Sequence, residues 1–222
     1  MTIPVLLCPS EDSPLRDGHS VKSCYAYSMG NQRMDPNNTA WGACNQYFVN
    51  ANPIPQGVLA GNMFGTGEAG HGNTMLAGQT SGVASRIGWA ANFRDITDGT
   101  SNVILMGEVR PQCGDHMRNG WMHFNSMWVA TTAPINYPIA CVRMDPLQDG
   151  TVWNDPSPRT GATTACNHWQ NWTTSQGFKS RHPGGAQFVM GDGSVHFISE
   201  NIDYRSYQYL GDRRDGNAVS VQ

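Results

Sequence analysis

One predicted hairpin near the C-terminus constrains the fold more than any other part of this sequence. Residues Gly185–Ser199 read GAQFVMGDGSVHFIS, in which two alternating apolar stretches flank Asp192 and Gly193. An Asp-Gly pair in this setting is the strongest short-range signal for a β-hairpin, because both residues tolerate the positive φ of a two-residue turn. Such a turn predicts that four large side chains share the core face of the hairpin: Phe188, Met190, Val195 and Phe197.

Four other segments have the pattern of regular structure. The apolar run Val103–Met106, inside Ser101–Arg110, predicts a central buried strand. Ser23–Tyr27 alternates and predicts a second strand, and the run Val5–Leu7 predicts a short strand within residues 1–10. A short helix is expected to follow the hairpin, with Asp203 as its N-cap and Gly211 just after its last turn.

The remaining chain is rich in loop-forming residues. It holds 25 Gly and 13 Pro, and only 14% of its residues are charged, well below the roughly 25% that is usual for soluble domains. No hydrophobic period runs through residues 28–92 or 111–175, so we expect long loop-rich elaborations there. These features predict a single domain over residues 1–222 with an α+β, mainly β fold and an antiparallel sheet.

Charge and hydropathy exclude two classes of protein. The net charge is -3 and no basic stretch occurs, which excludes electrostatic nucleic-acid binding. No run approaches 18 apolar residues, so the sequence as written predicts no membrane span. It also predicts no signal peptide, because no basic segment followed by an apolar one opens the chain.

Six cysteines are spread over most of the chain, without a CxxC pair. An even number at wide spacing is typical of disulfides formed in an oxidising compartment. Buried free thiols and a metal site remain alternatives, and the sequence leaves the pairing open. The disulfide candidates are Cys8, Cys24, Cys44, Cys113, Cys141 and Cys166.

Several polar residues are candidates for a site, and each also has a structural interpretation. Asp192 and Gly193 form the predicted hairpin turn, while Asp98 and Gly99 form a turn that starts the Val103 strand. The alternative is a structural calcium ion, which prefers carboxylate and amide oxygens. The candidate calcium ligands are Asp98, Asn102, Asp192 and Asp203.

His182 and Glu108 are further candidates. Extending the hairpin register places His182 opposite Asp203, so we expect the imidazole to cap the start of the hairpin, with a catalytic or metal-binding role as the alternative. Glu108 ends the predicted central strand, and we expect a buried carboxylate satisfied by a neighbour such as Arg94 or Arg110, with a catalytic acid as the alternative, although no second carboxylate is paired with it by spacing.

A second metal interpretation concerns the middle of the chain. Cys113, His116 and His123 are close in sequence, and zinc would need further ligands from Cys141, Cys166 or His168. A disulfide at Cys113 would exclude this site.

Three segments together resemble a known family. His182 is followed by nine residues and then Asp192-Gly193, within RHPGGAQFVMGDGSVHFISENID. This string resembles the H-x9-DG signature of the prepilin-like proteins abundant in Planctomycetes, a family of unknown function associated with prepilin-type processing. ITDGTSNVILMGE (Ile96–Glu108) is similar to that family's internal block, and LLCPSED (Leu6–Asp12) is similar to its early block. The three matches follow the family's order and span almost the whole chain.

The resemblance implies the head domain of a type IV pilin or type II secretion pseudopilin. Such proteins begin with a leader and a hydrophobic N-terminal helix, and this sequence starts at the strand that should follow them. The resemblance implies a non-enzymatic structural subunit of the cell envelope, extracellular, cell-surface or periplasmic. It would self-assemble into a filament or layer, with other envelope or secretion subunits as further partners. Some pseudopilin heads carry a structural calcium ion.

One alternative function comes from the aromatic residues. Trp and Tyr side chains are scattered through the predicted loops, where exposed rings could stack on sugars in an extracellular glycan-binding module. A metal-dependent hydrolase is less favoured, because no paired catalytic motif occurs, and we therefore expect no enzyme.

Overall fold

The structure is a computed structural model of the chain, and it describes residues 2–13, 15–16, 20–31, 74–139, 141–144, 152–154, 166–217, 219 and 221. The described strands are β1 (Tyr25–Ser28), β2 (Ile104–Glu108), β3 (Trp128–Val129), β4 (Val142–Met144), β5 (Val152–Asn154), β6 (Gly185–Met190) and β7 (Val195–Ser199). The described helices are α2 (Trp172–Ser175), α3 (Tyr204–Gly211) and the 3-10 turns η1 (Pro4–Leu6), η3 (Ala77–Gln79), η4 (Phe93–Asp95), η5 (Thr100–Asn102), η6 (Pro111–Cys113) and η7 (Met117–Asn119).

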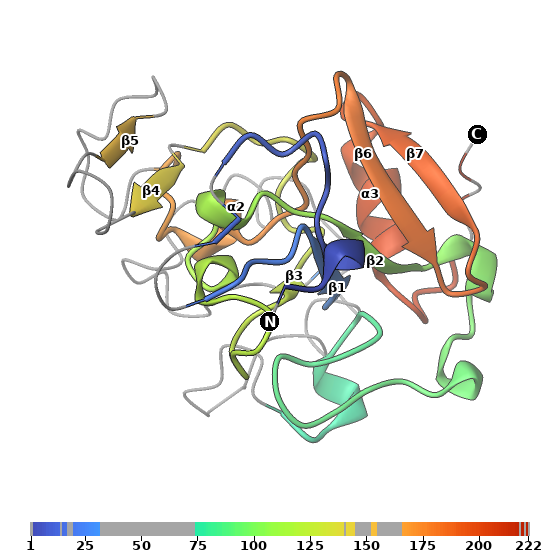
Figure 1. Cartoon of the computed structure of the whole chain (residues 1–222). Coiled ribbons are helices and arrows are strands. Elements are labelled where there is room, and N and C mark those ends of the chain that lie inside the picture. Colours follow the sequence, from blue (N-terminus) through green and yellow to red (C-terminus); the bar gives the residue numbers. More distant parts are fainter. Residues whose placement is uncertain are drawn as a thin grey trace.

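A five-stranded sheet in the order β3-β1-β2-β6-β7 organises the molecule (Figure 1). Its strand pairs are antiparallel except for β1 and β3, which run parallel, so the sheet is mixed rather than purely antiparallel. The predicted α+β, mainly β class is confirmed. Among the described residues, no helix is both long and apolar enough to cross a bilayer.

Three predicted segments form regular structure at or near the expected places. β1 and β2 lie within or beside Ser23–Tyr27 and Ser101–Arg110. α3 follows the hairpin, and the side chain of Asp203 caps it by accepting a hydrogen bond from the Ser206 N–H (2.8 Å). The predicted strand in residues 1–10 is wrong, because η1 forms there with Pro4 at its first position; proline favours the start of a helical turn and removes a ladder donor.

The hairpin is confirmed, but its register differs from the prediction by one residue. Gly191–Gly193 form a three-residue turn, with Gly193 at φ +85°, so Val189 pairs with Val195 and Phe188 with His196. Because side chains alternate along a strand, a shift of one residue turns every side chain of β7 to the other face. Phe188 and Met190 are buried as predicted, whereas Val195 and Phe197 are exposed and Ile198 is buried instead.

A bulge in β2 sets which side chains face each side of the sheet. Ile104 pairs with Met190, but Met106 pairs with Val189, so the register shifts between the two β2 residues. As a result Ile104 lies in the core, while Met106 lies on the opposite face. A bulge of this kind re-aims the side chains that follow it.

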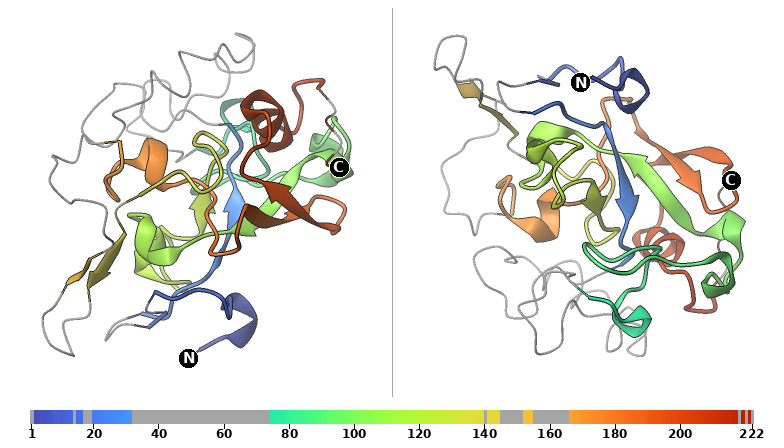
Figure 2. Two further views of the ribbon diagram at one scale, coloured as in Figure 1. Left: turned by 90° about the horizontal axis from the view of Figure 1, so that it is seen from above. Right: turned by 60° about the horizontal axis from the view of Figure 1, so that its bottom comes forward.

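The face of the sheet that packs against α3 is the inner face. The rings of Phe178 and Phe188 lie 4.9 Å apart, and Tyr207 of α3 packs edge-on to Phe188. A Cβ on Gly107 would come within 2.6 Å of both phenylalanine rings, so the close packing there requires glycine. The N-terminal segment lies on the opposite, outer face of the sheet (Figure 2).

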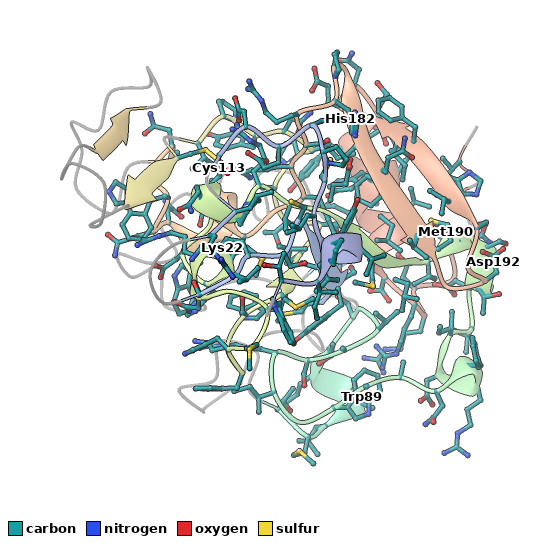
Figure 3. The ribbon with its side chains drawn as sticks, in the orientation of Figure 1. Lys22, Trp89, Cys113, His182, Met190 and Asp192 are labelled. Atoms are coloured by element: carbon teal, nitrogen blue, oxygen red, sulfur yellow. A yellow bond between two sulfur atoms is a disulfide. The ribbon has the colours of Figure 1, made fainter. Side chains whose placement is uncertain are left out.

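Buried cations hold the loops around the sheet. The chain has only two lysines, Lys22 and Lys179, and both are buried. Each donates to a backbone carbonyl, that of Arg118 and that of Thr174 respectively. Arg213, which is also buried, donates to the carbonyls of Thr80, Ser81, Gly82 and Ala77 and stacks on Trp89, which Figure 3 labels. Carbonyl groups of the loops thereby gain a hydrogen-bond donor, as buried backbone requires.

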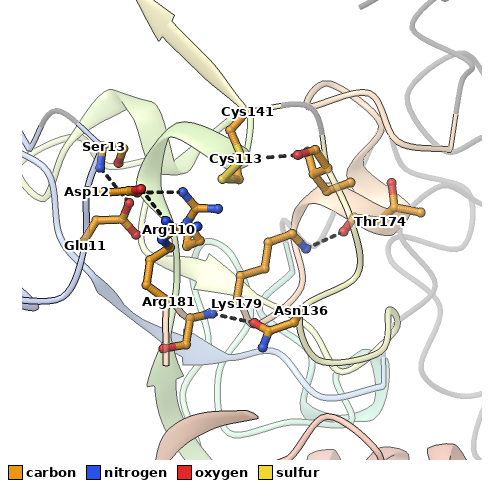
Figure 4. Close-up of a disulfide and its surroundings, with 12 residues drawn as sticks. Glu11, Asp12, Ser13, Arg110, Cys113, Asn136, Cys141, Thr174, Lys179 and Arg181 are labelled. Carbon is orange, nitrogen blue, oxygen red and sulfur yellow. Dashed lines mark hydrogen bonds and ion pairs between the residues drawn. A yellow bond between two sulfur atoms is a disulfide. The ribbon is translucent and has the colours of Figure 1, made fainter. Parts of the chain in front are cut away.

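The cysteines follow the prediction only in part. Cys113 and Cys141 form a disulfide beside Lys179 (Figure 4), and Cys166 is also disulfide-bonded. Cys8 and Cys24 are free and buried, so the predicted disulfides at these two positions are wrong. Cys44 lies outside the described residues.

Candidate functional site

A thiol, a carboxylate and an imidazole from distant parts of the chain meet on the outer face of the sheet. Glu108 Oε1 lies 3.2 Å from His182 Nε2 and 3.7 Å from Cys8 Sγ. Cys8 Sγ lies 3.9 Å from the same His182 Nε2. The three atoms all lie within 4.8 Å of one another, and no other such group of His, Cys, Asp and Glu occurs among the described residues.

Glu108 reaches this face because of the bulge in β2. It is the last residue of the strand, opposite Tyr25 of β1, and it follows the bulge that turns Met106 outward. The Gln187 N–H donates to Glu108 Oε2 (2.8 Å), which leaves Oε1 directed at the thiol and the imidazole. Glu108 is only 3% exposed, and a buried carboxylate is stable only when it is paired and hydrogen-bonded.

Two loops bring the other members of the cluster. Cys8 follows η1, and this segment is fixed to the sheet by a hydrogen bond from the Cys24 N–H to the Leu6 carbonyl (2.7 Å). His182 precedes β6, where its N–H donates to Ser180 Oγ (3.0 Å). Cys8 is buried, while the His182 side chain is 35% exposed, so the cluster is open to solvent on the imidazole side.

The cluster borders a cavity of about 540 Å³ on the outer face. The rest of the lining is largely apolar and comes from four strands of the sheet, β1, β2, β6 and β7, and from the N-terminal segment. Its lining residues are Cys8, Pro9, Ser10, Tyr25, Met106, Gly107, Glu108, His182, Gln187, Phe188, Val189 and Val195. A mostly apolar cavity with a few convergent polar groups is the usual form of a small-molecule site.

Burial raises the pKa of two groups next to the cluster. The pKa of the Cys24 thiol is raised to about 12, mainly by burial. Burial is also the main cause of the raised pKa of Tyr25, with Cys8 and Glu108 adding to it. Both groups are therefore neutral near pH 7.

The geometry of the cluster distinguishes a catalytic relay from a metal-binding site. In a relay of nucleophile, base and orienting carboxylate, the thiol and the carboxylate contact different nitrogens of the imidazole. Here Glu108 and Cys8 both approach His182 Nε2. The three groups converge on one point instead of forming a line, which is the arrangement that a metal ion requires.

The structure places Glu108 and His182 differently from two expectations. Glu108 is buried as predicted, but its partners are His182 and the Gln187 N–H, whereas Arg110 pairs with Glu11 and Asp12. His182 contacts Glu108 rather than Asp203, because the segment before β6 turns toward the outer face instead of continuing the hairpin.

The candidate calcium ligands do not all lie in one place: Asp98 and Asn102 share one turn, to which the Asp192 N–H donates at the Thr100 carbonyl (3.1 Å), whereas Asp203 lies apart from them. Asp192 lies in the hairpin turn and accepts from Ser194, at the opposite end of the hairpin from His182 (Figure 3). Asp203 caps α3 beyond the other end of β7. Asp98 accepts from the Asp215 and Gly216 N–H groups, while Asn102 donates to the Asp98 carbonyl and Gly99 adopts φ +93°. The structure does not bring the four candidate ligands together, and calcium binding stays a prediction.

The zinc interpretation of Cys113, His116 and His123 is excluded by the disulfide at Cys113. His116, one of its candidate ligands, is buried between two indoles, with ring centroids 5.0 Å from Trp128 and 4.6 Å from Trp172. This histidine therefore belongs to the aromatic packing around β3 and α2.

A family model described as a protein of unknown function, DUF1559, matches residues 1–205 of the chain. The chain belongs to this family. No curated protein and no solved structure matches it.

In this DUF1559 protein, the three sequence segments that resemble the prepilin-like family each supply one member of the cluster. LLCPSED supplies Cys8, ITDGTSNVILMGE ends on Glu108, and His182 is the histidine of the H-x9-DG string. The sequence analysis named Cys8 as a disulfide candidate and did not place the three segments at one site. The sequence signal for this site was the occurrence of all three segments in one chain. Segments that are far apart in sequence can each match the family when their residues meet at one site.

Proposed function

We propose that this DUF1559 protein is a non-enzymatic, pilin-like structural subunit of the cell envelope that associates with further copies of itself. The order of the three segments supports a pilin-like head, and so does a sheet that ends in a β-hairpin. The disulfides at Cys113 and Cys166 support an extracellular, cell-surface or periplasmic location, because such bonds persist in oxidising compartments.

The edge strand β7 is the observation that carries the proposal. β7 is the last strand of the sheet, and its outer face bears Val195, 63% exposed, and Phe197, 44% exposed. An edge strand with exposed apolar side chains is a template for pairing with another chain, and soluble monomers usually protect such edges with charge, proline or bulges. No charged residue lies within β7 itself. A second copy could add to this edge, with apolar side chains covering Val195 and Phe197.

The test is the mass and form of the full-length protein. Light scattering and negative-stain imaging over a range of concentrations should show concentration-dependent assemblies. Phe197→Lys should shift the assembly to at least tenfold higher concentration, because a charge in the contact costs on the order of 1–3 kcal/mol.

Phe93→Lys is the matched control, because Phe93 is 77% exposed but lies in η4, outside the sheet. The control should assemble like the wild type. A monomer at every concentration, or equal weakening by both substitutions, would refute association through β7.

The glycan-binding alternative receives less support from the indole side chains. Trp128 and Trp172 are buried, Arg118 covers the ring of Trp169, and Arg213 covers that of Trp89. Rings committed to such packing are not free to stack on sugars. Glycan-array binding by the monomer would favour this alternative over the structural role.

A further inference from the structure

We propose that Cys8, Glu108 and His182 bind one zinc ion, with the fourth coordination position open to the outer-face cavity. The inference does not depend on the proposed structural role. It rests on three independent features of the cluster: the spacing of its ligand atoms, its charge, and its place at the edge of a cavity.

The spacing of the three atoms fits tetrahedral zinc. With Zn–S near 2.3 Å and Zn–N or Zn–O near 2.1 Å, tetrahedral ligand atoms lie about 3.4–3.6 Å apart. The observed separations are 3.2 Å between nitrogen and carboxylate oxygen, 3.7 Å between sulfur and oxygen, and 3.9 Å between sulfur and nitrogen. Shifts of a few tenths of an ångström, within the freedom of these side chains, would bring all three into the coordination sphere.

The charge of the cluster also fits a divalent cation. Zinc binds cysteine as the thiolate, histidine as the neutral imidazole and glutamate as the carboxylate. Cys8 and Glu108 then contribute two negative charges that balance Zn²⁺, so that a neutral unit is buried. Without a cation, the side chains in contact with the buried carboxylate of Glu108, among the described residues, are the His182 imidazole and the Cys8 thiol.

The surroundings of Glu108 support a ligand role. The Gln187 N–H holds Oε2, so the carboxylate is fixed by β6 and presents Oε1 to the other two ligands. Such hydrogen bonds from outside the coordination sphere orient the ligands of metal sites. The mixture of sulfur, nitrogen and oxygen donors favours zinc over calcium or magnesium, which prefer oxygen alone.

The number of protein ligands sets the character of the site. Structural zinc sites use four protein ligands, whereas three ligands leave a position for water or another small donor. The cluster borders the 540 Å³ cavity, so this position would be reached from the apolar pocket over Met106 and Val189.

The test measures metal binding by the full-length protein, prepared with a reductant and freed of metal. The wild type should bind one zinc ion in competition with a chromophoric chelator. Cobalt should give a thiolate-to-cobalt charge-transfer band and the intense visible bands of a tetrahedral ion. Adding azide should shift the visible bands, because the fourth position is exchangeable.

Matched variants locate the site. Cys8→Ser and His182→Gln should each weaken zinc binding by at least about 100-fold, because even substitution of groups that only hydrogen-bond to zinc ligands costs about 10–100-fold. Cys24→Ser and His196→Gln are the controls: Cys24 is the other free thiol among the described residues, and His196, in β7, hydrogen-bonds to Ser194. Both controls should bind zinc like the wild type. Circular dichroism confirms that each variant is folded, and the cobalt spectrum of the wild type tests the site even where a variant fails to fold.

Several results would overturn the inference. One is the absence of saturable zinc binding by the reduced wild type, and another is a cobalt complex without a charge-transfer band. Equal losses in Cys8→Ser and Cys24→Ser would also exclude this cluster, as would a Cys8–Cys24 disulfide in protein purified without reductant. A cobalt spectrum that azide does not change would refute the open fourth position.

Discussion

The two faces of the central sheet come from the same strands but differ in what covers them. The inner face lies under α3 and is filled by aromatic and aliphatic side chains, with Gly107 allowing two phenylalanine rings to approach the backbone. The outer face bears the buried carboxylate of Glu108, a cavity and the exposed side chains of β7. Side chains on the inner face therefore contribute to folding stability, while side chains on the outer face are available for the binding and association that we propose.

The largest expected effect tests this division directly. Phe188→Ala on the inner face should lower the free energy of unfolding by about 4 kcal/mol, because it leaves a cavity beside Phe178 and Tyr207. Met106→Ala on the outer face should cost about 1 kcal/mol, because Met106 is only partly buried beside open space. Urea unfolding measures both variants. Equal losses would show that the outer face is packed as tightly as the inner one.

The hairpin register gives the next largest contrast. Ile198→Ala should cost about 3 kcal/mol, since Ile198 is 2% exposed in the core, whereas Phe197→Ala should cost less than about 1 kcal/mol. A two-residue turn at Asp192 and Gly193 would give the reverse order. Thermal unfolding of the two variants therefore decides between the registers.

The buried Lys179 predicts a dependence of stability on pH. Burial, with Arg110 adding to it, lowers the pKa of its amine to about 7 in the folded protein, against 10.5 for an exposed lysine. Between these values the unfolded chain binds more protons, so this group makes stability rise with pH from about 7 to about 10.5, by at most about 1.4 kcal/mol per pH unit.

Lys179→Met isolates this contribution, because other groups titrate alike in both proteins. The stability of the wild type relative to the variant should increase as the pH rises through this window, because the folded wild type then no longer buries a charged amine. A difference independent of pH would contradict a buried amine with a lowered pKa. Urea unfolding at a series of pH values gives the comparison.

The smallest effect concerns the cap of α3. Asp203→Ala should lower the free energy of unfolding by about 1 kcal/mol, because it removes the acceptor of the Ser206 N–H. Asp203→Asn keeps an acceptor oxygen and should recover most of the loss. An equal loss in both variants would show that the carboxylate charge, and not capping, stabilises the helix.

Local features could be predicted from the sequence, and long-range ones could not. The strands β1, β2 and β6, the hairpin and the Asp203 cap depend on neighbouring residues, and the sequence indicates them. The short strand in residues 1–10 fails because Pro4 begins a turn there. The disulfide interpretation fails for Cys8 and Cys24 because nothing local distinguishes a paired thiol from a free one.

The candidate site shows the same division. The sequence by itself determined three segments, a buried Glu108 at the end of a central strand, and a hairpin after His182. Only the tertiary structure decided that these residues meet. The bulge in β2 and the one-residue shift in β7 each change which face of the sheet a side chain occupies. The local free-energy difference between these alternative registers is small. Packing of Ile104 and Ile198 into the core selects among these registers, and that choice turns Glu108 toward Cys8 and His182.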